Sequence, residues 1–185
     1  MLGAYFPCEY ADSVFDIDYK KHYGRGYRGV IFDIDNTLVP HGDDSTPEVD
    51  ALFKEIHESG LKTLLLSNND TERIERFLQN IDSLYIPDAA KPNTGGYLRA
   101  VEMLEVNKKE AVFIGDQTFT DIVGANRSGI DSILVKYIGW GVEKKIGIKR
   151  RLEIIVLKFY SLRKSRQHRL GDIFKEGKHS ALEKG

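Results

Sequence analysis

The chain has 185 residues, of which 41% are hydrophobic and 30% are charged, and its formal net charge is −1. This composition excludes a disordered chain and a histone-like polycation, and the length suits one domain of average size. A single cysteine, Cys8, excludes an internal disulfide and a zinc site built on paired cysteines, which favours a reducing, cytoplasmic setting.

The small net charge conceals two segments of opposite charge. Residues 1–135 contain 13 basic and 23 acidic side chains, whereas residues 136–185 contain 14 basic and 5 acidic ones. Such an asymmetry indicates an anionic partner for the C-terminal segment. No run of about 18 apolar residues occurs, and the first ten residues lack the pattern of a secretory signal, so we expect neither a membrane span nor secretion.

Short apolar strands alternate with helical patterns in the middle of the chain. The predicted strands cover residues 29–33, 61–66, 84–86, 111–115 and 132–135. The predicted helices begin near Thr46, Asp70, Asn93 and Thr120. Five strands separated by four helices predict an α/β fold with a doubly wound, mostly parallel, Rossmann-like sheet. The segment 19–27 contains glycines but lacks the strand and helix that flank a phosphate-binding loop, so we expect a linker there.

The last 50 residues follow a different pattern. Apolar side chains recur at alternating four- and three-residue steps at Ile148, Leu152, Ile155, Phe159 and Leu162. This spacing predicts an amphipathic helix, and a strand over 152–157 is the alternative. We therefore expect an N-terminal extension over 1–28, a catalytic domain over 29–136 and a basic, helical extension over 137–185.

The basic extension has three interpretations. A basic helix with an apolar stripe is typical of a segment that lies on an anionic membrane surface. Alternatively, the stripe packs on the sheet and the basic side chains are solvated. Nucleic acid binding is a weaker interpretation, because no recognition motif surrounds the aromatic residues among these charges.

Polar side chains stand at the carboxyl ends of four predicted strands. They are Asp33, Asp35 and Thr37 after the first, Ser67 and Asn68 after the second, Lys91 after the third, and Asp116 and Asp121 after the fourth. Each alone is typical of a turn or a helix cap, but a parallel sheet brings all these loops to one edge, where ligands bind. Four carboxylates without His or Cys favour Mg²⁺ and phosphate oxygens, so the set predicts a phosphoryl-transfer site.

In order along the chain, these residues resemble the four motifs of the haloacid dehalogenase (HAD) superfamily of phosphatases. The resemblance extends from about residue 30 to residue 135. It implies that Asp33 is a nucleophile that forms an aspartyl-phosphate, and that Asp35 is the general acid and base.

The resemblance also implies roles for the other motif residues. Ser67, Asn68 and Lys91 would bind the phosphoryl group, with Thr37 supporting the first loop beside it. A magnesium ion would be held by the carboxylates of Asp33 and Asp116 and by the backbone carbonyl of Asp35. Asp121 would orient the coordination shell of the metal.

The two gaps that hold a cap domain in many members of the superfamily are short here. Residues 33–67 and 67–91 each leave room for one helix and one strand. The chain is therefore identified as a capless member of subclass IIIA, and it is most similar to the YqeG-type family. That family is similar to the phosphatidylglycerophosphate phosphatases of mitochondria and plastids. The resemblance implies a phosphorylated substrate, and it suggests this phospholipid at the inner face of a membrane.

Other functions remain open at this point. The same chemistry could serve a phosphoprotein, a nucleic-acid end or a soluble sugar phosphate. A signalling module that resembles response-regulator receivers also pairs Asp with Lys on an α/β sheet, but Asp35 argues against it, because an acid/base group beside the nucleophile shortens the life of a phospho-aspartate. The oligomeric state is not determined by the sequence.

Overall fold

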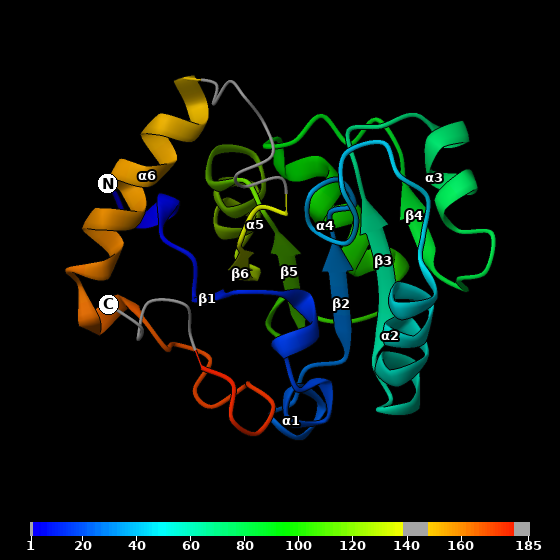
Figure 1. Ribbon diagram of the computed structural model, residues 1–185, viewed down its shortest axis with the longest axis horizontal. Coiled ribbons are helices and arrows are strands. Elements are labelled where there is room, and N and C mark those ends of the chain that lie inside the picture. The colour runs from blue at the N-terminus through cyan, green and yellow to red at the C-terminus, as the bar shows by residue number, and fades with distance from the viewer. Residues whose placement is uncertain (1, 139–147, 180–185) are drawn as a thin grey trace.

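A computed structural model describes residues 2–138 and 148–179 of the chain. Its centre is one six-stranded sheet in the order β1-β6-β5-β2-β3-β4, in which all neighbouring strands run parallel (Figure 1). The strands are β1 Glu9–Ala11, β2 Gly29–Phe32, β3 Lys62–Leu66, β4 Leu84–Ile86, β5 Ala111–Gly115 and β6 Asp131–Val135. The predicted α/β fold with a doubly wound, Rossmann-like sheet is confirmed.

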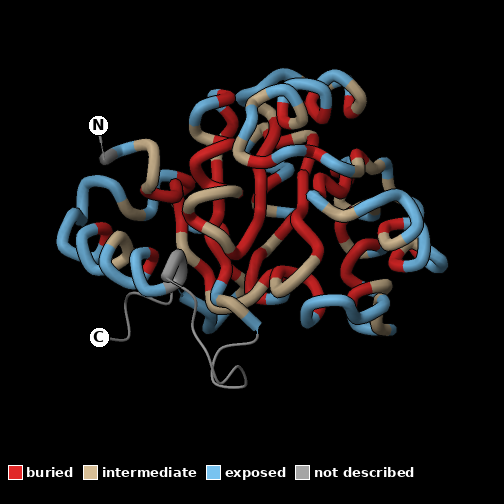
Figure 2. The backbone as a smooth tube through the Cα atoms, turned by 90° about the horizontal axis from the view of Figure 1, so that it is seen from above, coloured by how far each residue is buried: buried red, intermediate tan, exposed pale blue. Residues whose placement is uncertain are grey.

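Helices cover both faces of the sheet. They are α1 Tyr19–Gly24, α2 Pro47–Glu58, α3 Thr71–Phe77, α4 Thr94–Met103 and α5 Val123–Ser128. Shorter helical turns are η1 Leu2–Tyr5, η2 Val14–Asp16, η3 Lys108–Glu110, the π-helical η4 Thr118–Ile122 and η5 Lys164–Arg166. Because side chains alternate along a strand, Phe32 packs with α2 and α3 in one core while Ile31 packs with α4 in the other. Figure 2 shows this buried interior between the exposed outer helices.

Local sequence signals account for the starts of two helices that lead away from strand ends. The Thr46 hydroxyl accepts a hydrogen bond from the Val49 N–H at 3.3 Å, and Pro47 occupies the first position of α2. The Asp70 carboxylate accepts one from the Arg73 N–H at 2.9 Å at the start of α3. Capping by these side chains satisfies N–H groups that a helix leaves unpaired at its first turn.

No separate domain is inserted beside the carboxyl ends of the strands. The fully described residues between β2 and β3 form a loop and α2, and those between β3 and β4 form α3 and short connections. The prediction of a capless enzyme is therefore confirmed, and the carboxyl edge of β2 and β3 is not covered by an insertion.

Two features of the N-terminal segment differ from the sequence-based expectation. The sheet has a sixth strand, β1, which adds to its edge beside β6. Its residues, Glu9–Ala11, do not form an apolar run that would have predicted a strand. The segment 19–27 is not a plain linker, because α1 forms there with Asp18 as its cap. Figure 1 places α1 at the end of the sheet opposite the carboxyl ends of the strands, away from the edge at which the predicted site residues stand.

The predicted C-terminal helix is present as α6 Ile148–Ser161, and the alternative strand over 152–157 is wrong. The predicted apolar stripe points outward: Leu152, Ile155 and Phe159 are 47%, 51% and 51% exposed, and Leu162 just beyond the helix is 73% exposed. The helix instead contacts the body of the protein through buried Glu153 and Tyr160. The interpretation in which the stripe packs on the sheet is therefore also wrong. The side chains of Ile148, Lys149 and Arg150 lie outside the described residues.

The chain after α6 returns to the N-terminal segment. Lys21 forms an ion pair of 2.7 Å with Asp172, and Lys175 forms one of 2.9 Å with Glu55 on α2. Phe174 pairs with Ile17 in an isolated antiparallel bridge. We propose that residues 29–136 form the phosphatase domain, against which β1 and α6 pack from the two flanking segments.

One buried histidine makes the stability of this fold depend on pH. His22 in α1 is fully buried between the rings of Tyr19 and Tyr27. Its Nδ1 lies 3.2 Å from the Asp18 carbonyl oxygen, and no described group pairs with its Nε2. Burial lowers the pKa of His22 to about 4, against 6.5 in the unfolded chain. Between these two values the unfolded chain binds the proton more strongly, so acid destabilises the folded state.

We predict that His22→Phe reduces the loss of stability in acid. The wild-type protein should lose about 2 kcal/mol of unfolding free energy between pH 7 and pH 5 from this group, and the variant should not. Urea unfolding at both pH values measures the difference, and His179→Gln on the exposed C-terminal segment is the control. An identical pH dependence in wild type and His22→Phe would contradict the prediction.

Candidate active site

A polar pocket of about 170 Å³ opens at the carboxyl ends of β2 and β3. Its lining consists almost entirely of hydrogen-bonding groups, which come from Asp33, Asp35, Asn36, His41, Ser67, Asn68, Asn69, Lys91, Gln117 and Thr120. Five of the eight predicted site residues are among them. The other three, Thr37, Asp116 and Asp121, lie buried directly behind this lining.

A lysine lies between two carboxylates at the centre of the site. The Lys91 Nζ donates to Asp33 at 2.6 Å and to Asp121 at 2.8 Å. All three side chains are almost completely buried, at 3%, 9% and 1% exposure for Lys91, Asp33 and Asp121. Water therefore screens these charges little, and their mutual attraction is much stronger than that of a surface ion pair.

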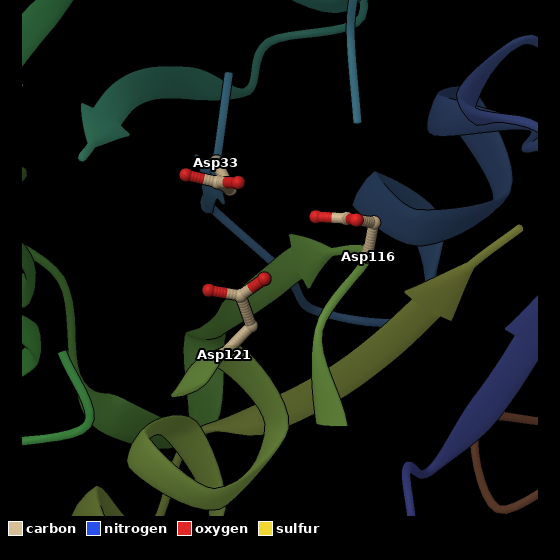
Figure 3. Close-up of side chains that lie close together, drawn as sticks. All are labelled: Asp33, Asp116 and Asp121. Carbon is tan, nitrogen blue, oxygen red and sulfur yellow. The ribbon is translucent and has the colours of Figure 1, made fainter. Parts of the chain in front are cut away.

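Asp116 completes a cluster of three buried carboxylates. Oxygen atoms of Asp33, Asp116 and Asp121 all lie within 4.8 Å of one another. Figure 3 shows the three side chains around a common space, with Asp33 after β2, Asp116 after β5 and Asp121 on the following helical turn. The Thr37 hydroxyl lies 3.4 Å from Asp116, so Thr37 supports the carboxylate cluster rather than lining the pocket.

The pKa values of Asp33 and Lys91 are both raised, for different physical reasons. Burial raises the pKa of Asp33 to about 6, with Lys91 lowering it in part and Asp121 raising it further. Burial alone would lower the pKa of Lys91, but the Asp121 and Asp33 carboxylates outweigh this and raise it. The lysine therefore stays a cation between the Asp33 and Asp121 carboxylates.

The backbone after β5 brings Asp121 against Asp33 and Lys91. Gly115 is required there because a Cβ atom at this position would lie 2.5 Å from the Asp121 Oδ2. The Gln117 N–H donates to the Asp121 carboxylate at 3.0 Å, and the Tyr97 hydroxyl donates to the Asp121 carbonyl at 3.2 Å. These contacts fix the carboxylate in a single orientation toward Lys91.

Asp35 is held by a different set of partners. Its carboxylate accepts hydrogen bonds from the Asn69 amide at 2.8 Å, from Arg73 at 3.0 Å and from the Gly42 N–H at 3.1 Å, and His41 lies 3.2 Å away. Burial raises the pKa of Asp35, but these partners lower it more, so the net shift is downward. The side chain therefore lines the pocket as a carboxylate, separate from the three-carboxylate cluster.

The loops after β3 and β4 are joined by hydrogen bonds. The Ser67 hydroxyl accepts from the Asn69 N–H at 3.1 Å, and the Asn68 side chain accepts from the Lys91 N–H at 2.8 Å. Asn68 thus ties the backbone of Lys91 to the loop after β3. Both loops then keep their polar side chains at the pocket.

The C-terminal helix reaches the loop that carries Asp116. The Glu153 carboxylate on α6 accepts a hydrogen bond of 2.8 Å from the Thr118 N–H, and Glu153 is 7% exposed. Since Thr118 follows Asp116 by two residues, α6 is attached to the back of the carboxylate cluster. A segment outside the predicted catalytic domain thus contributes to the position of this loop.

Several of these residues were not predicted from the sequence. Arg73 and His41 hold Asp35, and Glu153 holds the loop after β5. For Arg73 a signal exists, because it lies on the first turn of a helix that begins beside the pocket. Glu153 has no local signal, because nothing in the sequence fixes which side of α6 meets the sheet.

The carboxylate cluster fits a hard divalent cation. The three buried carboxylates offer only oxygen ligands, and their oxygen atoms lie within 4.8 Å of one another. Mg²⁺ prefers such ligands. The donor set therefore agrees with a divalent metal, and no His or Cys belongs to it.

Comparison with known proteins identifies the family. The family model of haloacid dehalogenase-like hydrolases matches residues 41–129. A Bacillus subtilis (strain 168) protein named "Probable phosphatase YqeG" is 38% identical over 137 residues, which are 73% of this chain and 80% of that protein. The chain belongs to the haloacid dehalogenase-like hydrolases. Together with the family match, this relative identifies the chain as a phosphatase of that family.

Two further similarities are more distant. Phosphatidylglycerophosphate phosphatase 1, chloroplastic/mitochondrial, of Arabidopsis thaliana is 28% identical over 155 residues, which are 77% of this chain but 44% of that protein. A crystal structure of an uncharacterized protein from Listeria monocytogenes serotype 4b has 26% sequence identity and a TM-score of 0.50. It covers 58% of this chain and 77% of that one. The fold of that Listeria protein agrees with the fold of this HAD-like phosphatase.

Proposed function

We propose that this HAD-like phosphatase hydrolyses a phosphate monoester in a Mg²⁺-dependent reaction through an aspartyl-phosphate on Asp33. One observation carries the proposal: Asp33 lines a polar pocket while it is buried against Lys91 and beside Asp116 and Asp121. A carboxylate in such a place is shielded from water, oriented by a cation and accessible to a ligand in the pocket.

The proposed reaction has two displacements at phosphorus. In the first, Asp35 must hold a proton, which it takes up from solvent as the negative charge of the bound phosphate raises its pKa. An Asp33 oxygen then bonds to phosphorus, the bond from phosphorus to the ester oxygen breaks, and Asp35 gives that proton to the departing alkoxide. In the second, Asp35 takes a proton from a water molecule whose oxygen bonds to phosphorus. The acyl phosphate bond then breaks, which frees phosphate and restores Asp33. Both carboxylates line the same pocket, as this sequence of steps requires.

The remaining site residues have supporting roles in this proposal. Lys91, Ser67 and Asn68 bind the phosphoryl oxygens, and Thr37 supports the loop beside them. Asp33, Asp116, Asp121 and the backbone carbonyl of Asp35 would hold the Mg²⁺. A bound Mg²⁺ supplies positive charge that offsets the negative charge of the phosphate and of the nucleophile.

We propose a phospholipid as the substrate, with phosphatidylglycerophosphate as the first candidate. The Arabidopsis relative carries the name of a phosphatidylglycerophosphate phosphatase. The site has no inserted cap, so a substrate anchored in a bilayer can approach it. The alternative substrates are a phosphoprotein, a nucleic-acid end and a sugar phosphate. If the protein hydrolyses one of these in preference to the lipid, the reaction is the same but the lipid is not its substrate.

We further propose that α6 lies on the anionic, cytoplasmic face of a membrane. Leu152, Ile155, Phe159 and Leu162 present an exposed apolar stripe. Exposed basic side chains surround it at Arg151, Lys158, Arg163, Lys164 and Arg166. This combination of an apolar face and basic flanks complements an anionic lipid surface. Among the described residues, no helix has the length and apolar character needed to cross a bilayer.

The nucleophile is tested by substitution and by chemical trapping. Asp33→Asn should lower phosphate release from a generic phosphomonoester by roughly 10³-fold or more, because no intermediate can form. Borohydride should convert the acyl phosphate of the wild-type protein to homoserine at position 33, as read by peptide mass spectrometry. Asp82→Asn on an exposed loop is the control and should retain activity. Undiminished turnover of Asp33→Asn would disprove the covalent mechanism.

The metal site is tested by direct binding. Calorimetric titration with Mg²⁺ should give a single site in the wild-type protein, weakened roughly tenfold or more in Asp116→Asn because a buried ligand charge is lost. Chelation should abolish phosphate release, and added Mg²⁺ should restore it. Equal Mg²⁺ affinity in wild type and Asp116→Asn would exclude Asp116 as a ligand.

Membrane contact is tested with vesicles of equal parts phosphatidylglycerol and phosphatidylcholine. Ile155→Asn with Phe159→Asn should weaken co-sedimentation roughly tenfold, since two exposed apolar side chains that would enter the bilayer are replaced. Binding should also fall with added salt and with phosphatidylcholine alone. Leu98→Asn, an exposed apolar position on α4, is the matched control. Binding that is equal in all variants would remove the membrane proposal.

A further inference from the structure

A second cleft lies between α6 and the carboxyl end of β6. It has a volume of about 320 Å³, which falls in the range of roughly 300–1,000 Å³ that small-molecule sites occupy. Apolar side chains form most of its walls: Leu134 and Val135 at the end of β6, and Ile154 and Leu157 on α6. Nothing in the proposed phosphoryl chemistry uses these four residues.

The cleft meets the proposed active site at Asp116. This residue lines the cleft, and its carboxylate also belongs to the buried cluster with Asp33 and Asp121. The same loop faces both cavities, since Thr118 lines the cleft while Gln117 and Thr120 line the polar pocket. The apolar cleft is therefore adjacent to the site of phosphoryl transfer rather than remote from it.

The outer wall of the cleft is held in place by two contacts of α6. Glu153, which also lines the cleft, accepts the hydrogen bond of 2.8 Å from the Thr118 N–H. Seven residues further along the helix, Tyr160 is fully buried, and its ring centroid lies 5.7 Å from that of Phe6. Both anchors lie on one side of α6, so the opposite side keeps its exposed apolar stripe.

We propose that this cleft binds the hydrocarbon part of the ester while the phosphate occupies the polar pocket, so that α6 acts as a substrate wall in an enzyme without a cap. The proposal rests on the proposed function and specifies its substrate as a phosphate monoester with an aliphatic chain. Such a substrate has an apolar chain and a charged phosphate. The apolar cleft would bury the chain, and the adjacent polar pocket would bind the phosphate.

A series of alkyl phosphates tests the cleft without a membrane. Methyl, butyl, hexyl and octyl phosphate are compared below their micelle concentrations, and kcat/KM is plotted against chain length. In the wild-type protein kcat/KM should rise roughly two- to fourfold for each methylene that enters the cleft. Ile154→Asn should flatten this slope, whereas Leu98→Asn should keep it, because Leu98 is exposed on α4 and does not line the cleft. The slope compares substrates within one variant, so it is independent of the amount of active protein.

A second variant keeps the test decisive if Ile154→Asn does not fold. Ile154→Trp fills the cleft and should shift the preference toward shorter chains. A wild-type slope of zero, with methyl phosphate hydrolysed, would overturn the cleft proposal and leave the proposed function intact. Hydrolysis of none of the esters would overturn the proposed function itself. Equal slopes in wild type, Ile154→Asn and Ile154→Trp would also overturn the cleft proposal, because the alkyl chain of the ester would then bind outside the cleft.

Discussion

The buried ion cluster of Lys91 with Asp33 and Asp121 is the constraint on which the site depends. A lysine and three carboxylates removed from water are costly unless each charge faces a partner at short range. The close approach of Gly115 to Asp121, the hydroxyl of Tyr97 and the amide of Asn68 hold these partners in position. The sheet therefore supplies a rigid frame for charges that would repel or be hydrated in a flexible loop.

The C-terminal segment belongs to this arrangement although it lies outside the matched family region. Glu153 connects α6 to the loop of Asp116, and the outward side of the same helix carries the exposed apolar stripe. One helix therefore has three sides with different surroundings: the catalytic loop, the apolar cleft and solvent. If α6 lies on a lipid surface, a substrate in that surface is next to the site that hydrolyses it.

The strands and helices of residues 29–135 could be predicted because their signals are local. Apolar runs of three to six residues, the Thr46 and Asp70 caps, and the glycine after α2 each fix an element without reference to the rest of the chain. The strand β1 could not be predicted in this way. Its three residues form a strand because β6 offers an open edge, which is a property of the assembled sheet.

The amino-acid sequence by itself determined the chemistry: carboxylates, a lysine and hydroxyl groups at the ends of parallel strands, which the topology of an α/β sheet must bring to one edge. Only the tertiary structure decided which of those carboxylates form a common cluster and which one has other partners. Asp33, Asp116 and Asp121 share a buried cluster with Lys91, while Asp35 turns to Asn69 and Arg73. It also decided which side of α6 is buried: Glu153 pairs with Thr118 on the buried side, and the predicted stripe lies in solvent. The reason is physical: spacing along a chain fixes which residues share a face, but the partner of that face depends on contacts between residues far apart in the sequence.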